Sequence, residues 1–140
     1  MTGPFERNDG LREIVWAGEQ LLAGGQHRAV LALAIRALRE HGDLPALRVL
    51  RARALLALHL VGDAERDLAL ALRVRPESAT IHRLLCEIAL RRGDLARAEA
   101  FLERALDLDP AHPRGHELAQ VTQGWRAEHT ARLYAVRRAA

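Results

Sequence analysis

The stretch ATIHRLLCEIALRRGDLARAEAFLERALDLDPAH, residues 79–112, decides the fold of this chain. Apolar residues recur in it every three or four positions, as they do along one face of an α-helix. Gly93 and Asp94 interrupt this pattern, and Pro110 ends it. A glycine followed by an N-capping residue is typical of a turn between two helices. The stretch therefore predicts a hairpin of two amphipathic helices.

The same plan recurs along the chain at a constant offset. Ala105, Ala71 and Ala37 form one evenly spaced series of small residues, since 105 − 71 and 71 − 37 both equal 34. Four further series have the same offset: Leu106, Leu72 and Leu38; Leu102, Leu68 and Ala34; Ala98, Ala64 and Val30; and Cys86, Ala52 and Gly18. Because the five series coincide, we infer an array of repeated helical hairpins.

A helical hairpin of this period, with small residues where helices touch, resembles the tetratricopeptide repeat (TPR). The resemblance implies an all-α fold, a right-handed α-solenoid of antiparallel helix hairpins. We expect a flexible leader over 1–10, three repeat units over 11–44, 45–78 and 79–112, and a capping helix over 113–140. The capping helix carries an apolar stripe of Leu118, Val121, Trp125, His129, Leu133 and Val136.

The second unit departs from the other two at its turn. Gly25 and Gly93 mark the turn in units one and three, but the corresponding position in unit two is His59. The next glycine, Gly62, follows three residues later. Since glycine is the strongest turn signal, we predict a first helix about one turn longer in this unit and a shorter second helix.

Three other features single out positions in units one and two. Gly18 stands inside a helix, where glycine costs about 1 kcal/mol relative to alanine, and the family resemblance implies close approach of the paired helix there. Arg48 and Arg51 stand where the family is usually apolar, which leaves the facing of that helix open. Leu33 and Ile35 make the second helix of unit one more apolar than the repeat requires, so either the leader or a partner chain covers them.

Length and composition limit the kinds of protein that this chain can be. With 140 residues, 49% of them hydrophobic and 28% charged, the chain is one soluble domain able to bury a core. Cys86 is the single cysteine, which excludes a disulfide framework and a cysteine-based zinc site, and its place among the small residues predicts burial. The sequence contains no signal segment and no apolar run of membrane-spanning length. We therefore expect a cytoplasmic protein.

Catalytic signatures are missing from the sequence. It contains no glycine-rich phosphate loop, no GxSxG and no HExxH, so we predict neither an enzyme nor a cofactor. His112 and His116 have the spacing that can place two imidazoles on one helix face. Pro113 and Gly115 lie between them, which argues against a continuous helix, and we predict exposed histidines and no metal site.

If the family layout transfers, the first helices of the three units line a concave groove that holds a peptide or a partner helix. Trp16 and Arg83 are the expected anchors, because tryptophan and arginine dominate binding hot spots. For Trp16, packing against the leader is an equally good interpretation. The predicted lining is Arg12, Val15, Trp16, Glu19 and Leu22 from unit one, Val49, Arg53 and Leu56 from unit two, and Thr80, Arg83, Glu87 and Leu90 from unit three.

The lining predicts the chemistry of the partner. Glu19 and Glu87 would repel a C-terminal carboxylate, and the chain has no lysine, so the chaperone-tail clamp of some TPR modules is not expected. An apolar helix flanked by mixed charges suits the lining better. The leading hypothesis is a small TPR adaptor that binds such a segment, with no small-molecule substrate and with a homodimer through Leu33 and Ile35 left open.

Two alternatives remain. Small three-unit TPR chaperones of bacterial secretion systems look similar in size and layout, and they hold an aggregation-prone segment of a substrate protein. The other alternative is a nucleic-acid binder, in which arginines of the C-terminal helix contact phosphates. Acidic residues are interspersed among the arginines, which argues against it. The arginines concerned are Arg126, Arg132, Arg137 and Arg138.

Overall fold

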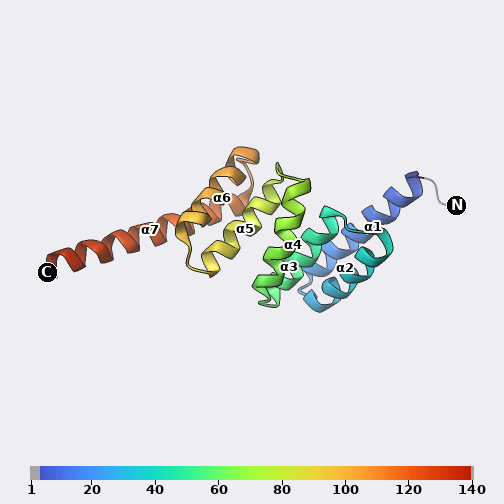
Figure 1. The fold of residues 1–140 in the computed structure, drawn as a ribbon, viewed down its shortest axis with the longest axis horizontal. Coiled ribbons are helices and arrows are strands. Elements are labelled where there is room, and N and C mark those ends of the chain that lie inside the picture. Colours follow the sequence, from blue (N-terminus) through green and yellow to red (C-terminus); the bar gives the residue numbers. More distant parts are fainter. Residues whose placement is uncertain (1–3, 140) are drawn as a thin grey trace. The chain divides into compact units, whose positions relative to one another are not determined.

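The computed structural model describes residues 4–139, with side chains from Gly10 onward, and its regular structure is helical throughout this range (Figure 1). The helices fall into two compact units, one ending at Pro76 and the other beginning at Glu77. None of the described helices is both long enough and apolar enough to cross a membrane. The predicted all-α class is confirmed.

The first unit consists of two helical hairpins. Small and branched side chains of the second and third helices form its core, where Val30 and Ala34 pack with Leu50 and Ala54. Half-buried leucines of the first two helices close over this cluster. The helices are α1 (Pro4–Ala23), α2 (His27–His41), α3 (Pro45–Ala57) and α4 (Val61–Val74).

The second unit is one hairpin followed by a long helix. Its helices are α5 (Ala79–Arg91), α6 (Leu95–Leu108) and α7 (Pro113–Ala139). Ser78 Oγ accepts a hydrogen bond from the Ile81 amide at 3.3 Å, and Asp94 Oδ1 accepts one from the Arg97 amide at 3.1 Å. Asp94, which follows the turn glycine, thus caps α6 as predicted, and Ser78 caps α5 in the same way. Asp63, which follows Gly62, lies inside α4 and caps no helix. The core of this unit is formed by Cys86, Ala89, Leu90, Ala98, Leu102 and Leu118.

The predicted long first helix in the second repeat is wrong. α3 and α5 each have 13 residues, and α4 and α6 each have 14. The turn between α3 and α4 lies at His59, whose φ of 63° is close to the 72° of Gly25 and the 73° of Gly93. Histidine is among the residues that adopt this left-handed conformation more often than most. His59 therefore replaces a glycine, and Gly62 lies inside α4.

Two backbone hydrogen bonds hold His59 in this conformation. Its own amide donates to the Leu56 carbonyl at 3.1 Å, and the Leu60 amide donates to the Leu55 carbonyl at 2.8 Å. This pair of bonds is typical of a helix that ends on a left-handed residue, and the same pair closes the α5–α6 turn. The hydrogen bonds that end the helix, and not the presence of a glycine, therefore fix the position of the turn in each repeat.

The expected leader is helical over most of its length. α1 begins at Pro4 and continues through Gly10, so the residues 4–10 belong to a helix instead of a flexible segment. Proline suits the first position of a helix, because its fixed φ is helical and no amide is needed there. Residues 1–3 lie outside the described part of the chain.

Arg48 and Arg51, whose facing the sequence left open, converge on Asp67 of α4. Asp67 is only 3% exposed. Arg48 Nη1 donates to Asp67 Oδ1 at 2.9 Å, and Arg51 donates through Nε and Nη2 at 2.7 and 2.6 Å. Arg48 also pairs with Asp43 at the start of its hairpin, Nη2 to Oδ2 at 2.7 Å. The two arginines on α3 therefore face α4, the second helix of the same hairpin.

Gly18 lies where two helices approach closely, but the neighbour differs from the expected one. A Cβ atom placed on Gly18 would lie 2.6 Å from Leu50 Cδ1. Leu50 belongs to α3, the first helix of the next hairpin, whereas the sequence pointed to α2, the paired helix. Gly18, the first member of its small-residue series, thus permits α1 to contact the first helix of the next hairpin.

Cys86 is fully buried, as its place in the same series predicts. Desolvation in this apolar surrounding raises the pKa of its thiol to about 11, and the nearby Glu87 carboxylate adds to the rise. The thiol is therefore neutral at physiological pH and has a packing role.

α7 starts one repeat period after α5, at the place where a fourth repeat would begin. It then runs for 27 residues without a turn. Gly18, Ala52 and Cys86 occupy one and the same position in the three repeats, and all three are buried. Gln120 falls at this position in α7, and it is exposed. α7 thus corresponds to the first helix of a repeat, continued through the place where the turn to a second helix would lie.

Candidate functional site

The predicted lining residues of the first unit lie on α1 and α3. Trp16 is 66% exposed, and Glu19 lies three residues further along the same side of α1. Arg53 Nη1 of α3 forms an ion pair with Glu19 Oε1, which joins the two helices. We call the set Arg12, Val15, Trp16, Glu19, Val49 and Arg53 the Trp16 surface; Arg12 is exposed, and the two valines are half-buried.

Three leucines of the predicted lining pack into the cores of their units. Leu22 is half-buried against the core of the first unit, and Leu56 is buried. Leu90 is buried with Ala98 and Leu102 of α6. These leucines stabilise their own unit by removing apolar area from water. The surface that a partner can reach is therefore narrower than the sequence pattern indicated.

Arg83, one of the two expected anchors, is held inside the second unit. It is 8% exposed. Its Nη2 donates to Thr80 Oγ1 at 3.1 Å, and its Nη1 lies 3.7 Å from Asp109 Oδ2 at the end of α6. Burial lowers the pKa of Arg83, and the carboxylates of Asp109 and Glu87 oppose this effect. Arg83 thus ties α5 to the end of α6, and it does not stand free for a ligand.

Glu87 is paired by a residue that sequence reasoning missed. Arg114 Nε, at the start of α7, donates to Glu87 Oε1 at 2.7 Å, and its Nη1 donates to Glu117 Oε2 at 2.9 Å. Hydrogen bonds to Glu117 and Glu87 raise the pKa of Arg114. The repeat carried the signal for this contact, because Arg114 lies one repeat period after Thr80 and so begins the neighbouring first helix.

Leu33 and Ile35, the candidate oligomer contact, both lie on α2 and are half-buried. An interface between two copies at this place stays a prediction.

The histidines near the start of α7 make local hydrogen bonds. The Arg114 amide donates to His112 Nδ1 at 3.1 Å, and His116 Nε2 lies 2.7 Å from the Pro110 carbonyl oxygen. Among the residues that the structure describes, no group of three potential ligands could hold a metal ion. His112 and His116 thus organise the loop between α6 and α7.

Known proteins resemble this chain at two levels, a family match over part of the sequence and a shared fold. Residues 49–113 match the family model of the tetratricopeptide repeat. The solved TPR protein TTC0263 of Thermus thermophilus is 26% identical, with a TM-score of 0.74, and the match covers 86% of this chain and 68% of that one. No curated protein matches the sequence.

Two solved complexes share the fold at lower identity. The second TPR domain of human RPAP3, in complex with the HSP70 peptide SGPTIEEVD, is 18% identical with a TM-score of 0.68, and the match covers 86% of this chain and 98% of that one. PcrH, in complex with the chaperone-binding region of PopD, is also 18% identical with a TM-score of 0.68, over 89% of this chain and 94% of that one.

The left-handed turn recurs in each of the three hairpins. Residues 49–113 match the tetratricopeptide repeat family, and the chain has the fold of solved TPR proteins.

Proposed function

We propose that this chain is a small adaptor, without catalysis of its own, that binds a peptide segment or a helix of a partner protein through the Trp16 surface. The observation that carries the proposal is Trp16 itself, which is 66% exposed on a helix whose other side is packed. Tryptophan is among the residues whose burial contributes most to protein interfaces. A large apolar side chain held this way on a folded helix is suited to anchor a partner.

The charges around Trp16 define the kind of segment that fits. Val15 and Val49 add half-buried apolar area, while Arg12 is exposed and the Glu19–Arg53 ion pair lies beside them. Ion pairs at the rim of an interface affect register and the rate of association more than affinity. The partner is therefore an apolar segment with charges of both signs at its edges.

The solved relatives support a role in protein binding. RPAP3 and PcrH were each solved with a bound protein segment, and both have the fold of this chain. PcrH favours a second candidate of the same kind, a chaperone that holds a segment of a substrate protein. The proposal places either activity in the cytoplasm, and the mass of the protein in solution tests the homodimer through Leu33 and Ile35.

Capture of the partner from an extract of the native cells tests the proposal. The tagged full chain is compared with Trp16→Ala and with Arg53→Glu, which change residues outside the core. We expect Trp16→Ala to weaken binding of the identified partner at least tenfold, because hot-spot tryptophans contribute roughly 2 kcal/mol or more. Val74→Ala, which trims an exposed apolar side chain of α4 outside the Trp16 surface, is the control and leaves this binding unchanged. Undiminished binding by Trp16→Ala at an unchanged melting temperature rejects the Trp16 surface as the site.

A further inference from the structure

The second half of α7 extends past the core of the second unit. Gly115, Leu118 and Thr122 are buried, whereas every residue from Gln123 to Ala139 is exposed. At 1.5 Å per residue this segment is about 25 Å long, and Figure 1 shows its end beyond α5 and α6. In proteins most of the stability of a helix comes from packing against other elements, which this segment lacks. The segment therefore gains stability from whatever binds along it.

One apolar stripe runs along α7 and is covered over only part of its length. Leu118 packs against α5 and α6 in the core of the unit. Trp125, His129, Leu133 and Val136 continue on the same side of the helix at steps of three or four. Trp125 is 39% exposed, Leu133 51% and Val136 68%. Side chains at this spacing form the kind of ridge that packs into the groove of another helix.

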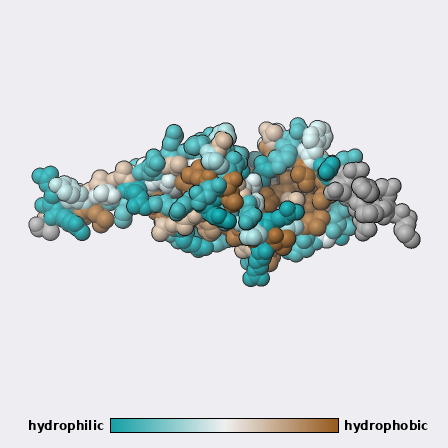
Figure 2. All heavy atoms as spheres, turned by 90° about the horizontal axis from the view of Figure 1, so that it is seen from above, coloured by the Kyte–Doolittle hydropathy of each residue, from teal (hydrophilic) through white to brown (hydrophobic). Residues whose placement is uncertain are grey.

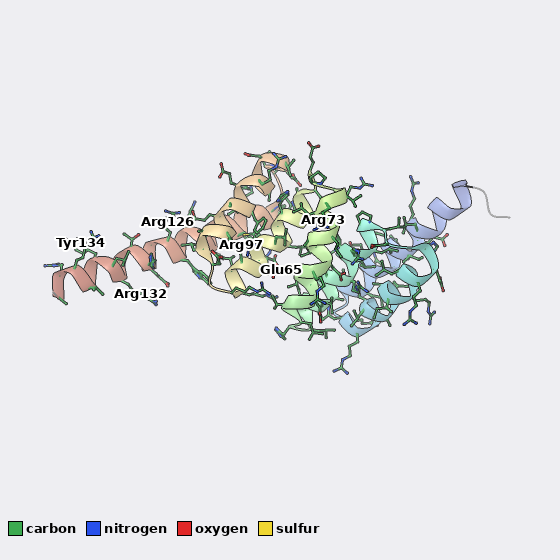
Figure 3. The ribbon with its side chains drawn as sticks, viewed as in Figure 1. Glu65, Arg73, Arg97, Arg126, Arg132 and Tyr134 are labelled. Carbon is green, nitrogen blue, oxygen red and sulfur yellow. The ribbon has the colours of Figure 1, made fainter. Side chains whose placement is uncertain are left out.

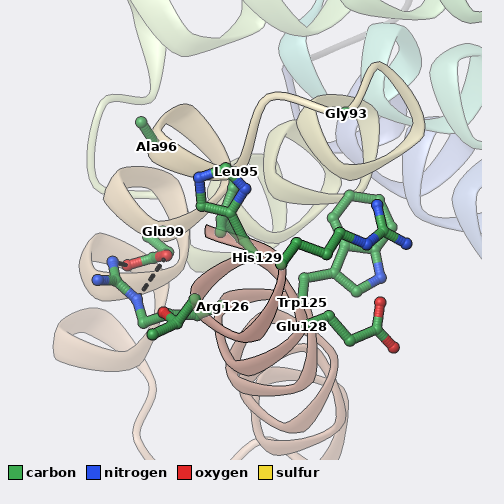
Figure 4. A pocket seen from close by; sticks show the side chains of 10 residues that line it. Gly93, Leu95, Ala96, Glu99, Trp125, Arg126, Glu128 and His129 are labelled. Carbon is green, nitrogen blue, oxygen red and sulfur yellow. Dashed lines mark hydrogen bonds and ion pairs between the residues drawn. The ribbon is translucent and has the colours of Figure 1, made fainter. Parts of the chain in front are cut away.

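The uncovered stripe begins in a groove of about 670 Å³ between the first turns of α6 and the middle of α7 (Figure 4). Leu95 and Ala96 of α6 and Trp125 of α7 provide its apolar lining. Arg126 and Glu99 form an ion pair at one side, with Arg126 Nε donating to Glu99 Oε1 at 3.1 Å. The groove gives the end of a partner helix a place against α6.

The exposed segment carries an excess of positive charge. It contains four arginines and a single acid, a net charge of +3. Glu99 neutralises Arg126, and Arg138 lies over the Tyr134 ring at 5.9 Å. Within the part of the chain that the structure describes, no ion pair joins Arg132 or Arg137 to an acid. In Figure 2 hydrophilic side chains flank a small apolar group near the end of α7.

This charge decides between the candidate occupants. A second copy brings an α7 with the same positive excess, so repulsion opposes pairing of two copies along the stripe. A phosphate-bearing surface, lipid or nucleic acid, meets the carboxylates of Glu99 and Glu128 in the groove lining. Tyr134 points to the opposite side of α7 from Arg132 (Figure 3), so it does not extend the stripe into a base-stacking platform. An amphipathic acidic helix can place apolar residues in the groove, beside Leu95 and Trp125, and its carboxylates further along α7, beside Arg132 and Arg137.

We propose that the exposed stripe of α7 docks an acidic amphipathic helix of a partner protein. The apolar residues of that helix cover Trp125, Leu133 and Val136, and so continue beyond α6 the packing that covers Leu118. Its carboxylates face Arg132 and Arg137. This surface belongs to the second unit and is separate from the Trp16 surface, so neither proposal depends on the other.

Fluorescence of Trp125 tests the docking directly. In the full chain with Trp16→Phe, Trp125 is the only tryptophan. The probe is a synthetic peptide about four helical turns long, with leucine at helical spacing and glutamate at the remaining positions. We expect saturable binding with a blue shift of the emission. The same peptide with lysine in place of glutamate binds at least tenfold more weakly.

Two variants locate the contact on α7. Leu133→Glu together with Val136→Glu removes apolar area and adds negative charge, so we expect at least tenfold weaker binding of the acidic peptide. Tyr134→Ala, on the opposite side of the helix, is the matched control and leaves the affinity unchanged. All three residues are exposed, so the core stays intact, and far-UV circular dichroism verifies this.

Several results overturn the proposal. These are the absence of an emission shift with the acidic peptide, equal binding of the lysine peptide, or full affinity in the Leu133→Glu, Val136→Glu variant. Tighter binding of a mixed-sequence oligonucleotide or of phosphatidylserine vesicles assigns the stripe to phosphate. Sedimentation that shows a dimer, dissociated by the same double variant, assigns it to a second copy.

Discussion

The guanidinium of Arg51 donates two hydrogen bonds to the buried carboxylate of Asp67, at 2.7 and 2.6 Å. Arg48 donates a third bond to the same carboxylate. Arginine suits this role because its planar fork matches the two oxygens of a carboxylate. The α3–α4 hairpin is therefore fastened by a polar contact where the repeat pattern is otherwise apolar.

Removal of Asp67 is expected to destabilise the protein strongly. Asp67→Ala leaves two partly buried guanidinium groups without their shared acid, and breaking one partner of a buried ion pair costs about 3–5 kcal/mol. We expect a loss of about 3 kcal/mol in the free energy of unfolding, measured by urea denaturation. Asp63→Ala is the control, since its exposed side chain lies 3.9 Å from Arg66, and its effect stays within about 0.5 kcal/mol. Equal effects of the two substitutions contradict this account.

Gly18→Ala is expected to lower the melting temperature, because the added Cβ meets Leu50 at 2.6 Å. Overpacking of a core costs about 1–3 kcal/mol, and Leu50 is only 2% exposed, so we expect this cost to exceed the gain of about 1 kcal/mol that alanine brings to a helix. Gly124→Ala is the matched control within a helix, since nothing lies within 4 Å of its added methyl group. That change raises the helicity of the exposed part of α7, as glycine is about 1 kcal/mol worse than alanine in a helix. Hydrogen exchange of the α7 amides measures the second effect, and a stabilising Gly18→Ala would contradict the first.

His59→Gly is expected to stabilise the α3–α4 turn by about 0.5–1 kcal/mol. A left-handed backbone costs a residue with a Cβ roughly 1–2 kcal/mol, and glycine avoids this cost but gains entropy in the unfolded chain. Gly93→His is the reciprocal test, because Gly93 has φ 73° where His59 has 63°. It should lower the free energy of unfolding by a comparable amount in thermal melts. If both substitutions act in the same direction, the turn does not require the left-handed residue.

Cys86 is expected to be unreactive in the folded protein. At pH 8 we expect no labelling by a disulfide reagent until denaturant is added, because the thiol is fully buried. The pKa of the thiol is raised from 9.0 to about 11 in the folded state. The unfolded thiol therefore loses its proton first as the pH rises, and stability falls between pH 9 and pH 11. Cys86→Ala removes this part of the pH dependence, and rapid labelling at pH 8 contradicts the burial.

The sequence predicted the features that depend on local spacing. The repeat period marks the helices, and Asp94 caps α6 as its place after the turn glycine predicts, because a cap involves neighbours within three residues. The turn at His59 was missed because residue preference is weaker than the hydrogen bonds that end the helix. A histidine takes the place of glycine there because the hydrogen bonds to the Leu56 and Leu55 carbonyls hold the turn in the left-handed conformation.

The candidate site was harder to predict, since exposure depends on which helices lie next to one another. Trp16 and Arg83 look equally suitable in the sequence, yet Trp16 is exposed, while Arg83 is enclosed between Thr80 and Asp109. Glu87 looks free, but Arg114 reaches it from α7. The contacts with Asp109 and Arg114 join residues far apart in sequence, so no local pattern encodes them, and only the repeat period points to Arg114.

Gln120 occupies the position at which each of the three repeats has a small buried residue. We expect a long polar side chain there to oppose the close approach of another helix, which Gly18 permits between α1 and α3. Extension of the array beyond α7 is therefore predicted to need a smaller residue at this position. Replacement of Gln120 by alanine, with a copy of the α5–α6 hairpin added after α7, offers a direct route to lengthening it.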